Sequence, residues 1–414
     1  MHKLKIILCC LLTGLYCSVL TGQLSKSYTR IITGAERMDV YLPLIKNKAI
    51  AVYANQTSIV GRSHLVDTLL KRGVHIKKIF APEHGFRGTA DAGENVSSYI
   101  DKQTGVPVVS LYGNKEKPSV ADLEDVDLIV FDIQDVGVRF YTYISSLQKM
   151  MEAAFENHKP MMILDRPNPN GFYVDGPVLD LKFKSFVGMQ PVPVVYGMTI
   201  AEYACMLAGE KWLSDSANKV YAFYRHADNS PDTTFHFQVI KCKNYTHKSR
   251  YALPVKPSPN LPNMQSVYLY PSVCFFEGTA VSLGRGTDKP FQQFGSPLFP
   301  QNLYSFTPQS VEGAKNPPLQ NQVCYGFDLS RIDVMKATGN RLQLKWLLKA
   351  YALFPDKEKF FLSNNYINKL AGTDLLMQQI KEGKTENEIR ESWKPELSKF
   401  KKIRKKYLLY KDFE

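Results

Sequence analysis

Short, almost wholly apolar runs separated by helix-like segments constrain the fold of the first half of this chain more than any other feature. The runs lie at 49–55, 76–82, 106–113, 127–134 and 161–169. Strands that are buried on both faces have this continuous pattern, and helices cover both faces of a parallel sheet. The sequence therefore predicts an α/β fold with a doubly wound, Rossmann-like N-terminal domain.

The sequence changes character after the last of these runs. A stretch rich in proline and glycine spans 167–198. Beyond it, the residue patterns predict helices at 199–213, 340–354 and 370–383, and strands at 219–225 and 237–242. We therefore predict a Rossmann-like catalytic domain over 23–198 and a smaller α+β C-terminal domain over 199–414.

The first 22 residues have the three-part layout of a secretory signal peptide. Lys3 and Lys5 precede an apolar run, and small residues follow near Thr21 and Gly22. The run is short for a membrane anchor, so we expect no stable membrane span in the mature chain. We predict a signal peptide over 1–22 and export to the periplasm or the outside of the cell.

The cysteines that follow this segment are widely spaced and have apolar neighbours. They are Cys205, Cys242, Cys274 and Cys324. No CxxC pair brings two of them together, which favours burial as free thiols over a zinc site. One disulfide stays open, because sequence spacing does not determine pairing.

Positive charge is concentrated near the C-terminus. The formal net charge is +13, and 394–411 carries eight basic residues. Such a run attracts polyanions in general. However, Phe400, Ile403, Tyr407 and Leu408 recur at helical spacing, so we interpret the segment as a solvated amphipathic helix. We predict no nucleic-acid partner.

Polar and charged side chains cluster at the ends of three of the apolar runs. They are Glu83, His84 and Arg87; Asp132, Asp135, Arg139 and Tyr141; and Asp165, Arg166 and Asn168. Ligands bind beyond the carboxyl ends of parallel strands, where these side chains would meet. A single charge there is often only a helix cap, whereas three neighbouring clusters predict a polar-ligand site. The loops at 256–263 and 275–295 add Asn260, Glu277 and Arg285.

The residue types limit the chemistry of such a site. The chain has no GxSxG nucleophile elbow, its GRGT segment lacks the ending of a phosphate-binding loop, and no GxGxxG follows the first strand. Histidines are few, and Glu83 and His84 would point to opposite sides of an extended segment. We therefore predict neither a metal nor another cofactor. Carboxylates, arginines, amides and aromatic rings together favour a sugar site, where a carboxylic acid can protonate a glycosidic oxygen.

Six blocks of the sequence resemble the NamZ-type exo-β-N-acetylmuramidase family. In order, they are FAPEHGFRGTADAGE, FDIQDVGVRFYTY, LDRPNPNGFYVDGP, VYGMTIAEYA, PSPNLP and FEGTAVSLGRGTDKPFQQFG. The resemblance implies an exported or periplasmic enzyme that releases N-acetylmuramic acid (MurNAc) from the non-reducing end of peptidoglycan fragments. It also implies an active-site cleft between a Rossmann-like domain and a smaller C-terminal domain. The family's proposed catalytic acid maps onto Glu83.

The second catalytic group stays open at this stage. Asp132, Asp135 and Glu277 are candidates for a base or nucleophile, and the substrate's own acetamido oxygen is the alternative. MurNAc carries a lactyl carboxylate that N-acetylglucosamine (GlcNAc) lacks, and arginine binds a carboxylate through two parallel hydrogen bonds. We therefore expect one or two of four arginines to recognise it: Arg87, Arg139, Arg166 and Arg285. The other candidates for substrate binding are His84, Tyr141, Asp165, Asn168, Asn260 and Glu277.

Two other functions remain as alternatives. An exported, two-domain protein could bind muropeptide sugars without catalysis, and a different hydrolase could act on the same polymer. Glu83 favours the enzyme, because a carboxylate in a half-apolar loop serves an acid catalyst better than it serves a receptor.

Overall fold

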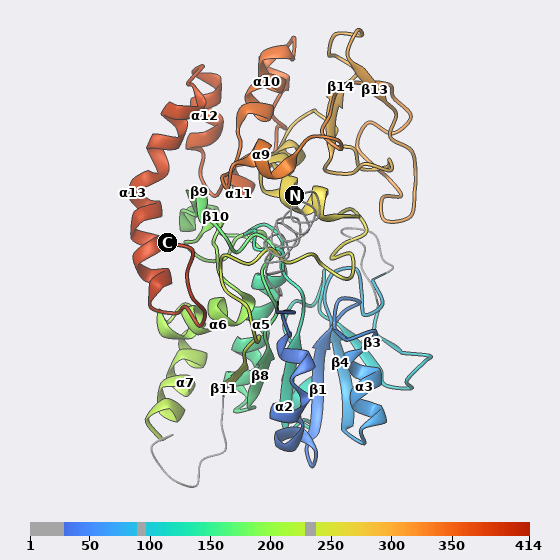
Figure 1. The fold of residues 1–414 in the computed structure, drawn as a ribbon, viewed down its shortest axis with the longest axis vertical. Coiled ribbons are helices and arrows are strands. Elements are labelled where there is room, and N and C mark those ends of the chain that lie inside the picture. The colour runs from blue at the N-terminus through green and yellow to red at the C-terminus, as the bar shows by residue number, and fades with distance from the viewer. Residues whose placement is uncertain (1–28, 89–96, 228–236) are drawn as a thin grey trace, which may run out of the picture. The chain divides into compact units, whose positions relative to one another are not determined.

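The computed structural model describes residues 29–88, 97–227 and 237–414. The predicted signal peptide, 1–22, lies outside these ranges. Residues Ile32–Glu414 form one unit. Within it, an α/β part is followed by a part with a small antiparallel sheet and several helices (Figure 1).

A seven-stranded sheet forms the centre of the α/β part. Its parallel strands are β1 (Ala49–Ala54), β4 (His75–Ala81), β6 (Pro107–Ser110), β7 (Leu128–Asp132), β8 (Met161–Leu164) and β11 (Phe237–Ile240). The short β5 (Tyr99–Ile100) pairs antiparallel with β6 at one edge. The spatial order β11-β8-β7-β1-β4-β6-β5 places the first strand in the middle. This is the order of doubly wound sheets, and the direction of winding changes between β1 and β7.

The strands are apolar on both faces because each face has its own core. In β7, Ile129 and Phe131 belong to one buried cluster, and Leu128 and Val130 belong to the other. The helices α2 (Met38–Ile45) and α3 (Leu65–Lys71) cover the second cluster. On the opposite face lie α5 (Tyr143–Glu156) and α6 (Ile200–Gly209). The unbroken apolar runs of the sequence therefore follow from burial on both sides.

One of the two strands predicted after residue 198 is a helix in the structure, and the other belongs to a different sheet from the one expected. Residues 219–225 lie in helix α7 (Asp215–Ala227), where Val220 and Tyr221 pack toward the core and Tyr221 stacks on Phe155 of α5. The segment's Val, Tyr and Phe residues favour a strand locally, but its contact with α5 requires a helical period. The strand at 237–242, which we expected in the second domain, is β11 and pairs with β8 of the large sheet.

The C-terminal part has a three-stranded antiparallel sheet in the order β12-β14-β13. Its strands are β12 (Gln293–Ser296), β13 (Tyr304–Phe306) and β14 (Cys324–Asp328). The helices of this part are α8 (Met264–Val273), α9 (Val334–Thr338), α10 (Lys345–Leu353), α11 (Tyr366–Ala371), α12 (Leu375–Lys381) and α13 (Glu386–Lys405). The predicted helix at 370–383 is interrupted at Gly372, whose φ of 73° lies in the left-handed region.

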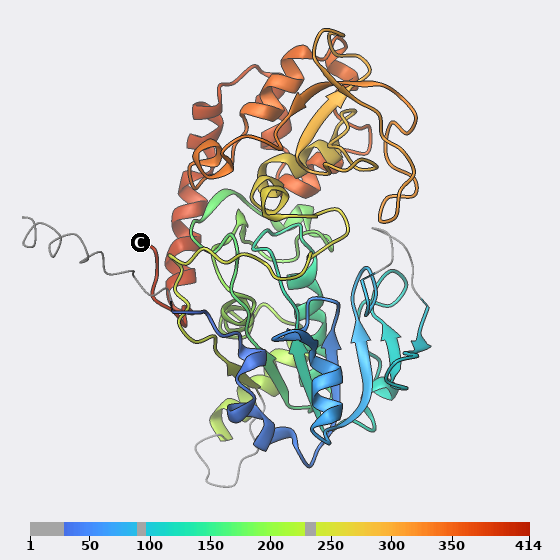
Figure 2. The ribbon, with the colours of Figure 1, turned by 45° about the vertical axis from the view of Figure 1, so that its right-hand side comes forward.

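The remaining elements of the two parts are short. They are the strands β2 (Ile59–Val60), β3 (Ser63–His64), β9 (Asp175–Val178) and β10 (Pro193–Val195), the helix α4 (Val120–Leu123), and the 3₁₀ turns η1 (Gly34–Glu36), η2 (Leu181–Phe183), η3 (Cys274–Gly278) and η4 (Lys357–Lys359). Figure 2 shows the parallel strands β1 and β4, in blue, pointing toward the yellow segments that follow residue 250. The carboxyl ends of the strands thus face the C-terminal part.

The basic C-terminal segment begins as the predicted amphipathic helix. Helix α13 continues to Lys405, and Phe400 on its inner face is buried. The four cysteines that follow the signal segment are free thiols, of which Cys205 is only half-buried. In the part of the chain that the structure describes, no helix has both the length and the apolar character to cross a membrane.

Candidate active site

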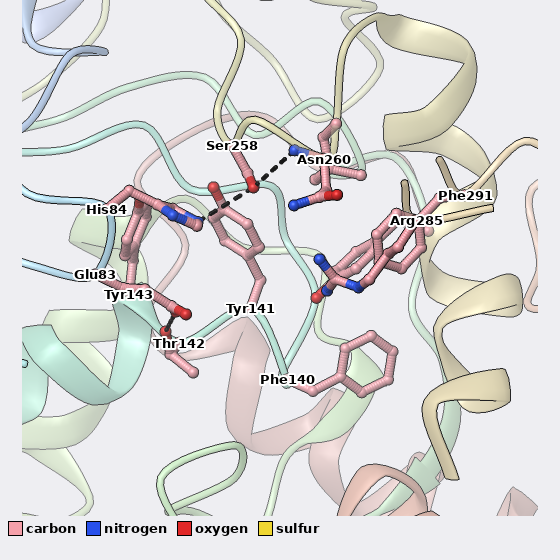
Figure 3. A pocket seen from close by; sticks show the side chains of 12 residues that line it. Glu83, His84, Phe140, Tyr141, Thr142, Tyr143, Ser258, Asn260, Arg285 and Phe291 are labelled. Atoms are coloured by element: carbon pink, nitrogen blue, oxygen red, sulfur yellow. Dashed lines mark hydrogen bonds between the residues drawn. The ribbon is translucent and has the colours of Figure 1, made fainter. Parts of the chain in front are cut away.

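A pocket lies beyond the carboxyl ends of β4 and β7, where the winding of the sheet reverses (Figure 3). It is lined by Glu83, His84, Phe140, Tyr141, Thr142, Tyr143, Ser258, Asn260, Leu261, Tyr270, Arg285 and Phe291. The first six follow strands of the large sheet, and the others come from the segments after residue 250. The cavity has a volume of about 60 Å³. The pocket therefore joins both parts of the chain at the position where doubly wound folds bind ligands.

A left-handed turn after β4 brings two consecutive polar residues into this pocket. His84 has a φ of 69° and Gly85 a φ of 74°, and the N–H of Gly85 donates to the carbonyl of Pro82. A non-glycine residue with positive φ costs roughly 1 kcal/mol or more, and such strain clusters at functional sites. Because the chain turns here, Glu83 and His84 both line the pocket. The expectation that they point to opposite sides of an extended segment was wrong.

Two hydroxyl groups hold the carboxylate of Glu83. The Tyr112 hydroxyl donates to Oε1 at 2.9 Å, and the Thr142 hydroxyl lies 3.4 Å from Oε2. Burial is the largest cause that raises the pKa of Tyr112, followed by the negative charge of Glu83. Tyr112 therefore keeps its proton and serves as a donor. Glu83 itself is half-buried, with its carboxylate directed toward Thr142 in the pocket wall (Figure 3).

Backbone carbonyls and neighbouring side chains fix the polar wall opposite Glu83. The Tyr141 hydroxyl donates to the carbonyl of Pro257 at 2.6 Å, and the Asn260 amide donates to that of Gly313 at 2.8 Å. Ser258 Oγ lies 3.2 Å from His84 Nε2 and thereby connects the two parts of the chain. The proline-rich loop at 256–263 thus holds its polar side chains in one arrangement, as a stiff backbone should.

Arg285 is the arginine that lines this pocket. Its Nε and Nη2 donate to Glu277 Oε1 at 3.1 and 2.5 Å, and its guanidinium lies 4.9 Å from the centre of the Phe291 ring. Burial lowers the pKa of Arg285, but the adjacent Glu277 carboxylate outweighs this and raises it overall. Arg285 and Glu277 also line a neighbouring, mainly apolar cavity of about 470 Å³ together with Tyr366. The positively charged guanidinium group of Arg285 therefore lines both cavities.

The other predicted arginines bind partners within the protein. Arg87 donates through Nε and Nη2 to Asp101 at 3.1 and 2.8 Å. Arg139 is completely buried and donates to three backbone carbonyls, those of Pro177, Val192 and Leu370. Arg166 donates through Nε and Nη2 to Asp132 at 2.6 and 2.8 Å. None of these three lines the pocket of Figure 3.

The predicted aspartates and Asn168 likewise lie outside the pocket lining. Asp135 accepts hydrogen bonds from the Tyr196 hydroxyl and from the N–H of Gly137, and burial raises its pKa to about 7. Asp165 accepts from the Tyr410 hydroxyl at 2.5 Å, and burial raises its pKa to about 7 as well. Asn168 donates to the carbonyl of Met198 at 2.8 Å. These contacts connect loops, and the substrate roles of these residues stay predictions.

Sequence reasoning missed several residues of the site. They are Tyr112, Phe140, Thr142, Leu261, Tyr270 and Phe291. Tyr112 had a usable signal, because it ends an apolar run of the same parallel sheet. Across the described ranges, no group of three or more His, Cys, Asp or Glu side chains is arranged to hold a metal ion.

Comparison with known proteins identifies the family of this chain. The family model "Exo-beta-N-acetylmuramidase NamZ, N-terminal" matches residues 50–265, and its C-terminal counterpart matches residues 268–410. The chain belongs to the NamZ exo-β-N-acetylmuramidase family. It is 37% identical over 388 residues to the peptidoglycan β-N-acetylmuramidase NamZ of Bacillus subtilis (strain 168), which covers 89% of each chain.

Two crystal structures of DUF1343 family proteins from Bacteroides fragilis NCTC 9343 have a similar fold. One is 46% identical, with a TM-score of 0.82, and covers 93% of this chain and 100% of its own. The other is 26% identical, with a TM-score of 0.76, and covers 92% of this chain and 99% of its own. The NamZ family assignment and these neighbours extend over both the α/β part and the C-terminal part.

Proposed function

We propose that this chain is an exo-β-N-acetylmuramidase that releases MurNAc from the non-reducing end of peptidoglycan fragments. Family membership and the name of the B. subtilis relative support the reaction class. The observation that carries the proposal is the placement of Glu83. It lines a polar pocket at the switch point of the sheet, held by the Tyr112 hydroxyl.

In this proposal, Glu83 donates a proton to the glycosidic oxygen as the bond to the anomeric carbon breaks. The positive charge that develops on the sugar ring requires a nearby electron-rich group. Tyr112 and Thr142 orient the Glu83 carboxyl group, so that its proton can reach a sugar bound in the pocket. The remainder of the fragment leaves with this proton as a new hydroxyl group. Water then adds to the anomeric carbon of MurNAc and gives a proton back to the Glu83 carboxylate, which restores the acid.

We favour the substrate's acetamido oxygen as the second reacting group. Among the described residues that line the pocket, Glu83 is the one carboxylate. Asp132 is bound to Arg166, and Asp135 is enclosed beside Tyr196. Glu277 faces the neighbouring cavity and holds Arg285. A substrate with a hydroxyl in place of the acetamido group should therefore not be hydrolysed, whereas turnover near that of the parent substrate would contradict this mechanism.

Arg285 is the group that we propose to recognise the lactyl carboxylate of MurNAc. Of the four candidate arginines, it alone lines the pocket. Two of its nitrogens bond to Glu277, and its Nη1 makes no hydrogen bond with any described residue. A guanidinium has five N–H donors in one plane, so a ligand carboxylate can bind beside Glu277.

The test is an assay of the purified protein with two substrates, MurNAc-GlcNAc and a chromogenic muramic acid glycoside. The Glu83→Gln variant is assayed in parallel. We expect release of MurNAc by the wild type and a near-complete loss in the variant. Binding of the disaccharide without release by the wild type would instead identify a sugar-binding protein. Hydrolysis by the variant at the wild-type rate would remove Glu83 from its proposed role.

We also propose that the protein is exported to the periplasm or the outside of the cell. The lysines, apolar run and small residues of 1–22 support this location, where the proposed substrate occurs. Cell fractionation with an antibody against the C-terminus tests it. Deletion of 2–22 should leave the protein in the cytoplasm, and an unchanged location after the deletion would contradict the proposal.

A further inference from the structure

A second groove lies in the C-terminal part, on the small antiparallel sheet. It has a volume of about 630 Å³ and is lined by residues of β13, β14 and α10, among them Tyr304, Phe327, Asp328, Trp346 and Lys349. Figure 1 shows α10 beside β14, with β13 next to it. The lining of this groove shares no residue with the pocket of Glu83. The groove is large enough for a small oligosaccharide, since ligand pockets usually span about 300–1,000 Å³.

Lysine ammonium groups lie close to aromatic rings that line this groove. Lys349 Nζ lies 4.2 Å from the centre of the Phe327 ring, and Lys345 Nζ lies 5.0 Å from that of Trp346. Lys289 Nζ lies 5.5 Å from the centre of the Tyr304 ring. Tyr304 is 40% exposed, so part of its ring is available to a ligand.

The groove carries an excess of positive charge. Asp328 forms an ion pair with Lys289 at 2.8 Å. Lys345 donates to the carbonyl of Ala337, which satisfies a hydrogen bond but leaves its charge uncompensated. Lys349 is exposed and has no carboxylate within ion-pair distance among the described residues. The two lysines that line the groove, Lys345 and Lys349, thus have no carboxylate partner, whereas the one lining aspartate, Asp328, is paired with Lys289. A ligand with negative charge would balance the difference.

We propose that this groove binds a carboxylate-bearing glycan outside the catalytic pocket. The C–H faces of sugar rings pack on exposed aromatic rings, and lysine side chains pair with carboxylates on the sugars. Building on the proposed function, the occupant is a peptidoglycan strand, whose MurNAc units carry lactyl and peptide carboxylates. The groove would hold the insoluble polymer while chain ends enter the pocket of Glu83.

The groove and the catalytic pocket are connected through one short segment of the chain. Strand β12 follows directly after the loop that carries Arg285 and Phe291, and Phe294 of β12 lines the groove. Lys289 of the same loop is held by Asp328 of β14. Strand β12 thus connects the loop of the catalytic pocket to the groove, although no side chain lines both.

Sedimentation with insoluble peptidoglycan tests the proposal with the full-length mature protein. Lys349→Glu reverses one charge of the groove, and Tyr304→Ala removes its exposed ring. Lys219→Glu is the matched control, because Lys219 is an exposed lysine within helix α7 and outside the groove. We expect about tenfold weaker binding in each groove variant, equivalent to about 1.4 kcal/mol, and unchanged binding in the control.

Hydrolysis of the soluble disaccharide and the melting temperature are measured on the same preparations. Both should match the wild type in Lys349→Glu, because the groove and the pocket share no lining residue. Wild-type binding by both groove variants would overturn the proposal. If the wild type does not hydrolyse the disaccharide, the proposed enzymatic function is overturned, but the proposed binding site in the groove is not.

Binding to chitin, an uncharged polymer of GlcNAc, separates packing on the aromatic ring from pairing with the lysine. Lys349→Glu should bind chitin as the wild type does, whereas Tyr304→Ala should bind it more weakly. An equal loss of chitin and peptidoglycan binding in Lys349→Glu would overturn the requirement for a carboxylate.

Discussion

Two carboxylates lie at the carboxyl ends of β4 and β7, the strands on either side of β1, and they have opposite surroundings. Glu83, after β4, is half-buried in a polar pocket and accepts a hydrogen bond from the Tyr112 hydroxyl. Asp132, the last residue of β7, has no exposed surface and accepts two hydrogen bonds from Arg166. Both residues meet the expectation for a site at the carboxyl ends of strands. Their partners decide which of them faces a ligand.

The difference shows what a buried ion pair does at the rim of a sheet. Arg166 also donates to the carbonyl of Ile59, so the pair connects β7, the loop after β8 and β2. A carboxylate that is held in this way is inaccessible to a ligand, and it contributes to the architecture. A carboxylate that is held by hydroxyl groups in the wall of a pocket is within reach of a ligand. We therefore expect substitutions at the two positions to affect different properties.

The largest expected effect is that of Glu83→Gln on catalysis. Loss of a general acid typically lowers a rate by about 10²–10⁴-fold, and the amide cannot donate a proton to a leaving oxygen. Its oxygen can still accept the hydrogen bond from Tyr112, so the melting temperature should not change. The measurement is kcat on MurNAc-GlcNAc beside a thermal unfolding curve. A loss of stability as large as that of Asp132→Asn would contradict the distinction between the two sites.

Asp132→Asn should act on stability instead. Breaking a buried ion pair costs about 3–5 kcal/mol, because Arg166 keeps its charge without a partner. Asp125→Asn is the matched control, since Asp125 pairs with Lys78 at the surface and such pairs contribute about 0–1 kcal/mol. Urea unfolding measures both variants. If Asp132→Asn proved as stable as its control, the pair would not have the architectural role inferred here.

Asp135 provides a pH-dependent form of the same comparison. Burial raises its pKa to about 7 from an ordinary value of 3.8, so the folded state holds a proton that the unfolded state releases. Stability contributed by this group should therefore fall as the pH rises from about 4 to about 7. Asp135→Asn should reduce that fall in unfolding free energy, and an unchanged pH dependence would show that Asp135 is ionised in the folded protein.

Arg285→Ala should alter substrate choice. A hydrogen bond to a charged group contributes about 1.5–3 kcal/mol, equivalent to about 10–100-fold in kcat/KM. The loss should be confined to muramic substrates, so that the ratio to the corresponding glucosaminide falls. Arg87→Ala serves as the control, because Arg87 binds Asp101 outside the pocket. Equal losses on both substrates in Arg285→Ala would rule out recognition of the lactyl group by this arginine.

The smallest expected effect is that of Tyr112→Phe. It removes one hydrogen bond to Glu83 and leaves the ring in place, which corresponds to about three- to tenfold in kcat. KM should change less than kcat, because Tyr112 positions the acid and is not part of the pocket lining. A change confined to KM would indicate that Tyr112 binds substrate directly.

The fold was predictable where a strand is buried on both faces of the sheet. The apolar runs at 76–82 and 127–134 correspond to β4 and β7, because both faces of those strands are covered by helices. Helix α7 was not predictable from 219–225, since its branched and aromatic residues favour a strand and contact with α5 decides otherwise. The edge that β11 joins is likewise set by pairing with a strand far away in the sequence.

The sequence by itself placed Glu83, His84, Tyr141, Asn260 and Arg285 among the candidate residues, and the structure brings these five to one pocket. It could not distinguish Arg285 from the other three arginines. Arg139 donates to the carbonyl of Leu370, which is 231 positions away, and such a contact leaves no local pattern. Residue type and position relative to a strand are local properties that the sequence contains. Whether a charge is neutralised within the protein or faces a cavity depends on distances in space, and only the tertiary structure determines them.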